Sequence, residues 1–487
     1  MKYEALLHRL KPFGITGIVY DSREAGPCKI FACIRGEHCD GHDYIDAALQ
    51  RGTRVVLCDH IVEKDVYQIV VKDVRAFMGE LAAAICNNPD EQLLMIGITG
   101  TNGKTTSAYI TRSILQAAGI PCGLIGTVVY HDGLREEEAD RTTPEGPDIQ
   151  CLLERMVKNG CKACVMEASS HGLDQGRLLG CSFDRVGFTN LTQEHLEYHH
   201  SMEEYFSAKK LLFSQYTRKN WKGIINADDP YGHILRDSYP ENSMVYSVLG
   251  SPNSDFSAVI REYTLAGMVV DVSMPTGEMI SGLHVPLLGV YNVSNILQAI
   301  GIAWSLGVNN EAIRNGIERL SPVPGRLERY LLSNGVCCVI DFAHSPDGLE
   351  KVLSTLKEVC KGDLCILWGA GGDRTPLKRP VAGQIMAQWA QKIIITNDNP
   401  RTEDPKAIAE QIEQGILANA KSAQYRIILD RRKAIFTALS EAHPGDVVLI
   451  AGKGPEKYIT IGKEKIPFQD LEVLLDWCRQ NSVEIRS

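Results

Sequence analysis

The sequence predicts an α/β protein of three domains: a small α/β N-terminal domain, a central phosphate-loop domain on a mostly parallel sheet, and a Rossmann-like C-terminal domain. Three observations predict it. Short apolar runs of strand type alternate with helical patterns along the chain. One such strand leads through a glycine-rich loop into a helix. In the last third of the chain, four apolar runs each end in a polar or glycine-rich loop.

Two breaks in this pattern set the expected domain boundaries at 1–89, 90–324 and 325–487. The first is the turn-rich run Asn87-Asn-Pro-Asp90, and the second lies near Pro322 to Arg326, after which a new series of strands begins. A chain of 487 residues suits two to four domains.

Composition limits the class of protein. Charged residues make up 23 % of the chain and the net charge is -9, which is ordinary for a soluble protein and disfavours a nucleic-acid binder. The chain lacks a run of about 18 apolar residues and a signal-peptide pattern, so we expect a cytoplasmic protein without a membrane span. Its fifteen cysteines are then reduced thiols. The pair Cys161 and Cys164 starts a predicted buried strand, which favours a core role over zinc or redox chemistry.

The strands of the last third predict a binding face. They are expected at 336–340, 364–368, 392–396 and 447–451, and the loops that follow them begin at Asp341, Gly369, Asp398 and Gly452. Ligands of open parallel sheets bind at the carboxyl ends of the strands. The four loops are therefore expected to converge on one edge.

The strand at 93–99 runs into Gly100-Thr-Asn-Gly-Lys-Thr-Thr106, and a helix with Ile110 and Ile114 on one face follows. Strand, glycine loop and helix are the setting that a phosphate-binding loop requires, because backbone N–H groups and the helix N-terminus attract phosphate oxygens. The strict motif has glycine where Ile98 stands, so the loop is a variant. An accidental match is the weaker reading.

The variant loop resembles that of the Mur ligase family, which builds the peptide of the bacterial cell wall. Further motifs that resemble this family run through the chain in order: Asp21-Ser-Arg23, Asp40-Gly41, Thr142-Thr-Pro-Glu145, Glu167-Ala-Ser-Ser-His-Gly172, Phe188-Thr-Asn-Leu191, Gly289-Val-Tyr-Asn292, Pro324-Gly-Arg326, Asp341-Phe-Ala-His344, Asp398-Asn-Pro-Arg401 and Gly452-Lys-Gly-Pro-Glu456. Departures are Arg141, where asparagine is frequent, and Pro455, where histidine is usual.

The resemblance implies an ATP-dependent ligase acting as a monomer on small molecules. In such an enzyme ATP phosphorylates the D-Glu carboxylate of UDP-MurNAc-L-Ala-D-Glu, and the amine of an amino acid attacks the acyl phosphate. Catalysis rests on placement and on neutralising charge. The resemblance implies ATP contacts at Gly100, Thr101, Asn102, Gly103, Lys104, Thr105, Thr106, Asn292, Asn295, Arg326 and Asp341.

Mg²⁺ is the implied cation, and its expected ligands are Thr105, Glu167, His195 and Lys209. An ammonium group has no lone pair for a metal, so Lys209 is expected to carry a CO2-derived carbamate, as the matching lysine of the family does. Lys104, Lys209, His195 and Glu167 are the expected catalytic residues. The pair His199-His200 is read as surface or structural rather than as a zinc site.

Substrate contacts also follow from the resemblance. For the UDP-sugar peptide they are Tyr20, Ser22, Glu37, His38, Cys39, Thr142, Thr143, Ser169, Gln175 and Arg177. For the incoming amino acid they are Arg374, Asp398, Asn399, Pro400, Arg401, Gly452 and Glu456.

The motif Asp398-Asn-Pro-Arg401 favours meso-diaminopimelate as the amino acid added. Diaminopimelate carries a second carboxylate, which the Arg401 fork pairs with bidentately, and a buried unpaired arginine penalises L-lysine. Arg374 is expected to hold the other carboxylate, and Gly452 and Glu456 the distal ammonium.

Three alternatives stay open at this stage. One is a family member that adds L-lysine. Another is a folylpolyglutamate synthase, which shares the loop but lacks a UDP-binding first domain. The third is a nucleotide-driven switch protein without ligation, which the crowded substrate motifs disfavour.

Overall fold

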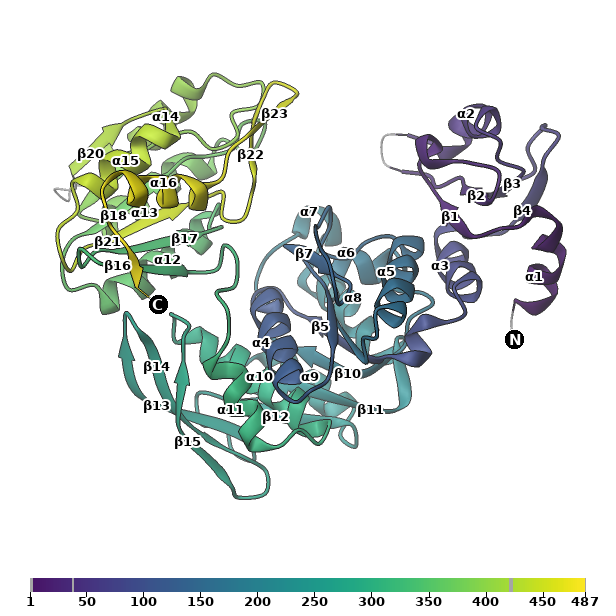
Figure 1. The fold of residues 1–487 in the computed structure, drawn as a ribbon, viewed down its shortest axis with the longest axis horizontal. Helices are drawn as coiled ribbons and strands as arrows, with labels where there is room; N and C mark the ends of the chain where they lie inside the picture. Colours follow the sequence, from purple (N-terminus) through teal and green to yellow (C-terminus); the bar gives the residue numbers. More distant parts are fainter. Residues whose placement is uncertain (1–2, 37–38, 420–423, 487) are drawn as a thin grey trace. The chain divides into compact units, whose positions relative to one another are not determined.

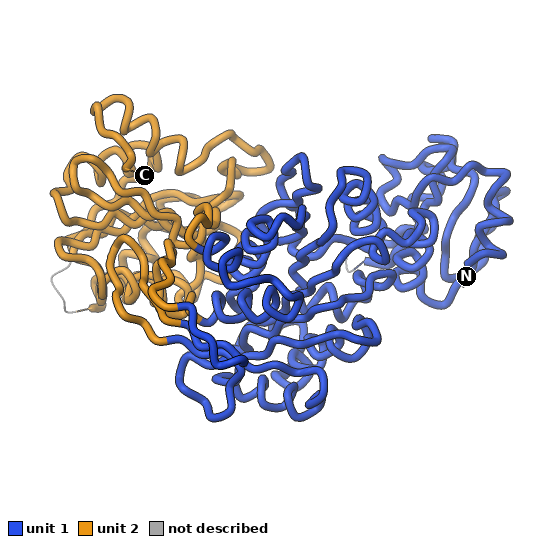
Figure 2. Tube along the Cα trace, turned by 60° about the horizontal axis from the view of Figure 1, so that its bottom comes forward, with its two compact units in different colours: residues 1–258, 272–280, 294–317 blue, residues 259–271, 281–293, 318–487 orange. Residues whose placement is uncertain are grey.

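The structure is a computed structural model that describes residues 3–36, 39–419 and 424–486. The chain packs as two compact units, residues 1–258, 272–280 and 294–317 in the first and 259–271, 281–293 and 318–487 in the second (Figure 2). The predicted α/β class is confirmed (Figure 1). The expected three-domain boundaries remain a proposal.

The N-terminal domain is built on a parallel four-stranded sheet of order β1-β2-β3-β4. Its elements are α1 (Glu4–Leu10), a 3-10 turn (Lys11–Phe13), β1 (Gly17–Val19), a 3-10 turn (Ser22–Glu24), β2 (Lys29–Ala32), a 3-10 turn (Gly41–Tyr44), α2 (Ile45–Gln50), β3 (Val55–Cys58), β4 (Tyr67–Val70), α3 (Val74–Ile85) and a 3-10 turn (Pro89–Gln92). Alternate residues of β3 enter two separate cores, Val55 and Leu57 on one face and Val56 and Cys58 on the other. Both faces of the sheet are therefore covered.

The central sheet has eleven strands in the order β15-β14-β13-β12-β11-β10-β5-β9-β6-β7-β8. Its elements are β5 (Leu94–Thr99), α4 (Lys104–Ala117), β6 (Cys122–Ile125), β7 (Val129–His131), β8 (Glu136–Glu138), α5 (Gly146–Lys158), β9 (Ala163–Glu167), α6 (Ser170–Asp174), β10 (Phe183–Phe188), α7 (Leu196–His199), α8 (Met202–Ser214), β11 (Thr217–Asn226), α9 (Pro230–Ser238), β12 (Ser243–Ser247), β13 (Phe256–Thr264), β14 (Gly267–Ser273), β15 (Met279–Val285), α10 (Tyr291–Ser305) and α11 (Asn310–Glu318). The strands from β12 to β6 run parallel, as predicted.

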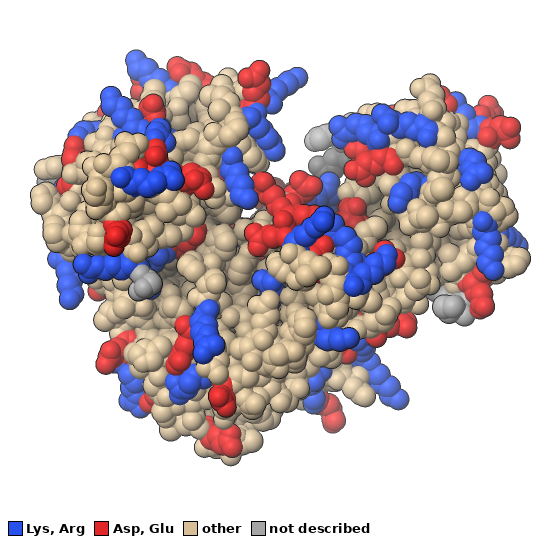
Figure 3. All heavy atoms as spheres, in the orientation of Figure 1, with Lys and Arg blue, Asp and Glu red and all other residues tan. Residues whose placement is uncertain are grey.

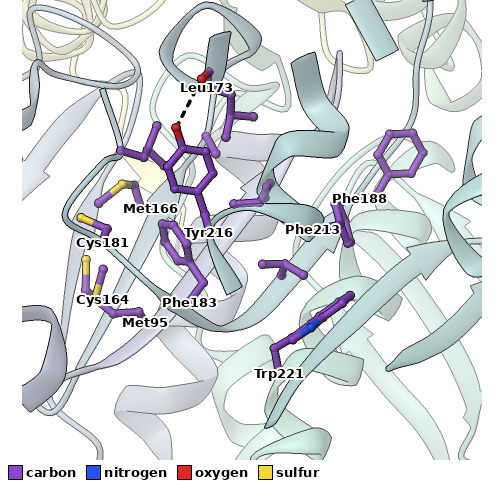
Figure 4. Close-up of a cluster of buried hydrophobic side chains, with 14 of the residues drawn as sticks. Met95, Cys164, Met166, Leu173, Cys181, Phe183, Phe188, Phe213, Tyr216 and Trp221 are labelled. Carbon is purple, nitrogen blue, oxygen red and sulfur yellow. Dashed lines mark hydrogen bonds between the residues drawn. The ribbon is translucent and has the colours of Figure 1, made fainter. Parts of the chain in front are cut away.

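A buried cluster of aromatic and sulfur-containing side chains holds this sheet against its helices (Figure 4). Phe183 and Phe188 come from β10, and Phe213 comes from α8. The Tyr216 hydroxyl donates to the Leu173 carbonyl at 3.4 Å, so the one polar atom of that ring is satisfied. This packing fixes α8 beside the phosphate loop.

The C-terminal sheet has the order β20-β19-β18-β21-β17-β16-β24, and the strands from β20 to β17 are parallel. Its elements are β16 (Glu328–Leu332), β17 (Cys337–Asp341), α12 (Pro346–Val359), β18 (Leu364–Trp368), α13 (Lys378–Trp389), β19 (Lys392–Ile395), α14 (Pro405–Leu417), β20 (Gln424–Ile427), α15 (Arg431–Ser440), β21 (Val447–Ala451), β22 (Tyr458–Ile461), β23 (Glu464–Pro467), α16 (Asp470–Gln480) and β24 (Ile485–Arg486). Two separate cores cover its faces.

The predicted strands of this domain were right in place and differ by one residue at three of their ends. The strand expected at 336–340 is Cys337–Asp341, because Asp341 pairs in register with Ala451 of β21. The strand expected at 392–396 ends at Ile395.

All fifteen cysteines are free thiols, and Cys161 and Cys164 are buried in the core as expected. None of the helices within the described residues combines the length and apolar character that crossing a bilayer requires. The face drawn in Figure 3 carries both cationic and anionic side chains, and a group of anionic side chains gathers near its middle.

Candidate functional site

The loop between β5 and α4 takes a conformation that only glycine accommodates. Gly100 has φ +144° and Gly103 has φ +88°. A Cβ at Gly100 would lie 1.8 Å from the Thr189 hydroxyl, and one at Gly103 would lie 2.2 Å from Oδ1 of Asn295. Both sterics and φ exclude larger residues, so the backbone stays open for close approach by a ligand.

Two lysines converge on one carbonyl of this loop. Nζ of Lys104 donates to the Gly100 carbonyl at 2.9 Å and to the Thr101 carbonyl at 2.8 Å. Nζ of Lys209, from α8, donates to the same Gly100 carbonyl at 2.8 Å. The loop thus brings two lysine side chains together where phosphates are expected.

Lys209 is buried, unlike its neighbour Lys210. Its side chain is 2 % exposed, and burial, followed by the positive charge of Lys104, holds its pKa well below the ordinary value. The Tyr205 ring lies 4.5 Å from its Nζ, and the Tyr205 hydroxyl lies 3.1 Å from the Thr101 hydroxyl. Lys210 instead reaches the exposed Ser238 hydroxyl. The environment of Lys209 therefore favours a neutral amine.

Glu167 ends β9 with its carboxylate buried to 1 % exposure. Oε2 accepts hydrogen bonds from the hydroxyls of Thr105, at 2.9 Å, and Thr127, at 3.0 Å. Oε1 accepts from the Thr127 backbone N–H at 2.9 Å. A buried carboxylate beside a threonine hydroxyl is an all-oxygen donor set, which suits Mg²⁺. The residues present thus fit the implied cation.

His195 sits at the N-terminus of α7 with φ +58° and a 40 % exposed side chain. Its ring meets those of His171 and Tyr205 edge-on, at centroid distances of 4.9 and 6.1 Å. Burial, and then the charges of nearby histidines, lower the pKa of His171 to about 4. His199 is buried against Tyr205 and its pKa is also lowered by burial, whereas His200 is exposed. Two histidines with lowered pKa values, His171 and His199, therefore lie on this side of the loop.

Three arginines surround the buried carboxylate of Glu145. Arg141 lies 2.8 Å from Oε1, Arg177 lies 3.2 Å from the same oxygen, and Arg75 of α3 lies 3.3 Å from Oε2. One carboxylate offsets one of three guanidinium charges, so the cluster carries a positive excess of two. Such a cluster suits a ligand with phosphate or carboxylate groups.

The remaining residues expected at the UDP-sugar peptide lie in the first unit. Thr143 donates its hydroxyl to the Glu167 carbonyl at 2.8 Å and accepts from the Ser169 N–H at 3.0 Å. The Thr142 hydroxyl lies 3.1 Å from that of Thr127. Gln175 accepts from Arg177 at 2.6 Å.

The N-terminal domain meets α5 through Tyr20, whose hydroxyl donates to Oδ2 of Asp148 at 2.7 Å. Burial raises the pKa of both groups. Ser22 begins a turn capped by the Asp21 carboxylate, and Cys39 is exposed. Glu37 and His38 lie outside the described residues.

In the second unit, the loops after β19 and β21 form one polar cluster. Asp398 is buried, which raises its pKa against the opposing effect of Lys453. Nζ of Lys453, itself buried, donates to Oε2 of Glu456 at 2.7 Å. Asn399 donates to the same Glu456 oxygen at 2.8 Å. A Cβ at Gly452 would lie 2.8 Å from Oδ2 of Asp398, so glycine is needed there.

Arg401 occupies a left-handed conformation with φ +50°, and its half-buried side chain turns toward the loop after β18. Nη1 donates to the Gly372 carbonyl at 2.6 Å, and the backbone N–H donates to the Thr460 carbonyl at 3.1 Å. Arg374, on the same loop as Gly372, is exposed. The loops after β18 and β19 thus place two guanidinium groups on one part of the domain.

A buried arginine holds the loops after β18 and β19 together. Arg379, 2 % exposed, donates to both oxygens of Glu403 at 2.8 Å and to the Gly371 carbonyl at 3.2 Å. Arg379 lowers the pKa of Glu403 to about 2. The pair ties the loop after β18 to the loop after β19.

The remaining residues expected to contact ATP are divided between the units. Asn295 accepts from the Ser107 hydroxyl at 3.4 Å in the first unit. Asn292, in the second, donates to the Leu288 carbonyl at 2.6 Å. Asp341 accepts from the Leu327 and Ala343 N–H groups, both at 2.7 Å, and burial raises its pKa. Arg326 lies 5.7 Å from the Phe342 ring centroid.

Comparison with known proteins decides the family. The chain is 39 % identical, over 94 % of its own length and 93 % of the relative's, to a protein of Bacillus licheniformis named UDP-N-acetylmuramoyl-L-alanyl-D-glutamate--2,6-diaminopimelate ligase. Proteins of the same name from Geobacillus thermodenitrificans and Geobacter metallireducens are 38 % and 39 % identical over at least 93 % of each chain.

The chain belongs to the Mur ligase family.

Family models match this Mur ligase in three stretches: the Mur ligase family catalytic domain over residues 14–85, the Mur ligase middle domain over 98–303, and the glutamate ligase domain over 325–454. A solved UDP-N-acetylmuramoyl-L-alanyl-D-glutamate--2,6-diaminopimelate ligase matches with a TM-score of 0.67 and 31 % identity, over 96 % of this chain and 95 % of that one. A folylpolyglutamate synthase from Thermotoga maritima, 16 % identical with a TM-score of 0.60 over 77 % of this chain and 89 % of that one, shares the fold.

Sequence reasoning missed three residues of this Mur ligase that the structure places among the candidates. Thr127 follows β6 without any motif around it. Glu145 and Lys453 stand inside quoted motifs but had no assigned role. Each of the three either is a buried ionisable residue or contacts one. Burial can be seen only in the folded structure.

Proposed function

We propose that this Mur ligase is a cytoplasmic, monomeric enzyme that uses ATP to join meso-diaminopimelate to the D-Glu carboxylate of UDP-MurNAc-L-Ala-D-Glu, through an acyl phosphate. The observation that carries the proposal is the pair of lysines on the Gly100 carbonyl, inside a chain whose curated relatives bear that activity in their names. The proposed domains are 1–89 for the UDP moiety, 90–324 for ATP and 325–487 for the amino acid.

Activation of the carboxylate requires two anions to meet. A carboxylate is a poor acylating agent because it is anionic and offers a bad leaving group, and phosphorylation removes both defects. Lys104 and the N–H groups of the Gly100–Thr106 loop bind and neutralise the ATP phosphates. Thr105 and Glu167, joined at 2.9 Å, would hold Mg²⁺ together with His195. When bound, Mg²⁺ supplies further charge neutralisation at the phosphates.

Lys209 completes this set as a carbamate. Its neutral amine attacks the carbon of CO2: a C–N bond forms, one C–O double bond becomes a carboxylate single bond, and a proton leaves the nitrogen, so that the neutral amine becomes a carbamate anion with two oxygen atoms. The lowered pKa favours this reaction, because only the neutral amine carries the lone pair. The resulting carbamate is an oxygen ligand for the cation.

The UDP-sugar peptide is anionic, and the first unit offers a matching surface. The positive excess of the arginine cluster around Glu145 supports binding of its diphosphate or carboxylate groups through Arg177. Tyr20 and Ser22 follow β1, at the carboxyl end of the N-terminal sheet, where ligands of parallel sheets bind.

The amino acid is selected in the second unit. Arg401 and Arg374 offer cations for the carboxylates of diaminopimelate, and the carboxyl groups of Asp398 and Glu456 offer acceptors for its ammonium groups. L-lysine lacks the second carboxylate, so it offers no anion to the Arg401 guanidinium. This lowers the affinity for lysine relative to diaminopimelate. The L-lysine-adding alternative is disfavoured by this arginine. Folylpolyglutamate synthases share the fold at 16 % identity and support no shared substrate.

Omission of single substrates tests the proposal. We expect ADP to form steadily only when ATP, the UDP-MurNAc-dipeptide and diaminopimelate are all present. Steady ADP formation without the dipeptide would support a switch ATPase instead. Formation of ADP with a folate acceptor would support the synthase.

A further inference from the structure

The N-terminal domain holds a histidine-rich cluster that the ligation reaction does not use. His42 is the second residue of the 3-10 turn Gly41–Tyr44, which comes after β2, and Asp59 and His60 follow β3 directly. One ligand atom from each of these residues lies within 4.8 Å of the others. The cluster sits at the carboxyl edge of the parallel sheet.

Asp40 sets the orientation of the His42 ring. Its Oδ1 accepts the His42 backbone N–H at 3.0 Å and lies 2.6 Å from Nδ1 of the ring. Gly41 between them packs so closely on the Ile34 backbone N, 2.7 Å from a Cβ position, that the turn is held in place. A carboxylate on Nδ1 fixes the tautomer with the proton there and leaves a lone pair on Nε2, the arrangement found behind metal-bound histidines.

That Nε2 atom is buried and has no hydrogen-bond partner among the described residues. The His42 side chain is only 10 % exposed, and the atom nearest to Nε2 in the cluster is Oδ1 of Asp59, at 3.3 Å. A lone pair facing a carboxylate oxygen is repulsive unless a cation lies between them. The same Asp59 oxygen lies 2.5 Å from Nδ1 of His60.

The geometry points to a divalent transition-metal site, of the Zn²⁺ class, formed by Nε2 of His42, Nδ1 of His60 and Oδ1 of Asp59. Zinc binds nitrogen and carboxylate oxygen at about 2.0–2.2 Å in a tetrahedron, which separates its ligands by roughly 3.3 Å. The His42–Asp59 distance of 3.3 Å already matches. The His60–Asp59 distance must widen, and the 53 % exposed His60 side chain has room to move.

Two further groups define the character of the site. Arg35 lies 2.9 Å from Oδ2 of Asp59 and donates to Oδ1 at 3.3 Å, so its guanidinium competes with the metal for this carboxylate and moderates the affinity. The exposed side of His60 leaves the fourth position to water. Two imidazoles favour Zn²⁺, Co²⁺ or Ni²⁺ over Mg²⁺, which prefers oxygen ligands.

The site links the segment after β2 to the segment after β3, so bound metal stabilises the folded N-terminal domain. This role does not depend on the proposed ligation activity.

Zn²⁺ binding to the full chain, measured by equilibrium dialysis after chelator treatment, tests the proposal. We expect one equivalent to be lost, with affinity falling at least 10-fold, in His42→Gln and in His60→Ala. His60 is half-exposed, so that variant keeps the fold even if His42→Gln does not. His443→Ala, which changes an exposed histidine in the second unit, is the matched control and binds like the wild type. Glu167→Gln keeps the equivalent as well, because it alters only the proposed Mg²⁺ set.

Co²⁺ substitution separates this site from thiol binding by the fifteen free cysteines. We expect visible d–d bands that vanish in His60→Ala, without thiolate charge-transfer absorption. The midpoint of thermal unfolding rises with Zn²⁺ in the wild type and not in His42→Gln. Equal Zn²⁺ binding by the wild type and both histidine variants, no bound metal at all, or a Co²⁺ spectrum of thiolate type alone would overturn the proposal.

Discussion

At the scale of single residues, Lys209 shows how burial changes chemistry. Its neighbour Lys210 has the same side chain on the same helix, yet reaches an exposed serine. The buried amine of Lys209 contacts Gly100 of the phosphate loop and has a lowered pKa. A lysine in water stays an ammonium group, whereas burial shifts this one toward the neutral amine.

Replacement of Lys209 by alanine is therefore expected to lower the ligation rate at least 100-fold, because the variant loses an oxygen ligand for the cation. Initial rates of ADP release with all three substrates measure this. Lys210→Ala is the matched control and keeps the wild-type rate. Wild-type turnover by Lys209→Ala would rule out the catalytic role.

Arg401 is the residue that we expect to select the incoming amino acid. Arg401→Gln is expected to lower kcat/KM for diaminopimelate by roughly 100-fold, the order of about 2–3 kcal/mol for a lost charge-assisted pair. The value for L-lysine is expected to stay or rise. Lys406→Ala, an exposed cation on the next helix, serves as control. An equal loss for both amino acids would mean that Arg401 only supports the loop.

At the scale of elements, the strand–loop–helix of the phosphate site is held by contacts that leave no room for side chains. The Gly103 position faces Oδ1 of Asn295, from α10, at 2.2 Å from a Cβ. The loop conformation therefore depends on a helix nearly two hundred residues away in sequence.

Gly103→Ala is expected to weaken ATP binding at least 10-fold and to destabilise the protein by about 1–3 kcal/mol, because φ is +88° and the Cβ clashes. The double variant Gly103→Ala with Asn295→Ala removes the clash but not the strain in φ. It should regain part of the stability, measured by urea unfolding. No difference between the single and double variants would show that the clash contributes nothing.

At the scale of the whole molecule, pH acts on stability through ion pairs such as that of the buried Arg379 with the partly exposed Glu403. The pKa of Glu403 is about 2 in the folded state and about 4.5 in the unfolded chain. Between these values the unfolded state binds more protons, so stability falls as the pH falls. The contribution is fully present above about pH 5 and is lost as the pH approaches 2.

Glu403→Gln is expected to cost about 1–3 kcal/mol at neutral pH and to flatten the acid limb of the stability curve between pH 4.5 and 2. Thermal unfolding midpoints across this range measure it. Glu410→Gln, an exposed glutamate paired loosely with Lys406 at 3.8 Å, is the control and leaves the curve unchanged. An acid limb as steep as the wild type in Glu403→Gln would contradict the assignment.

Much of the architecture follows from local sequence signals. The strands Leu364–Trp368 and Val447–Ala451 are the apolar runs themselves, because a strand buried on both faces is apolar throughout. The phosphate loop is likewise local, since strand, glycines and helix adjoin in sequence.

What the sequence did not reveal depends on contacts distant along the chain. Glu145 pairs with Arg75, which lies seventy residues earlier in the sequence. His42 lies beside Asp59, which follows a different strand. Neither pairing produces a periodic pattern in the sequence from which it could be predicted. The roles expected for Arg401, Lys209 and the UDP-sugar contacts stay predictions, because they concern ligands rather than the chain.

The product of a competition assay tests the central claim most directly. The enzyme, ATP, Mg²⁺ and UDP-MurNAc-L-Ala-D-Glu are incubated with equal concentrations of meso-diaminopimelate and L-lysine, and the product is weighed by mass spectrometry. We expect the UDP-MurNAc-tripeptide that contains diaminopimelate, with one ADP formed per product. A product that contains lysine in equal amount, or ADP without any ligated product, would contradict the account.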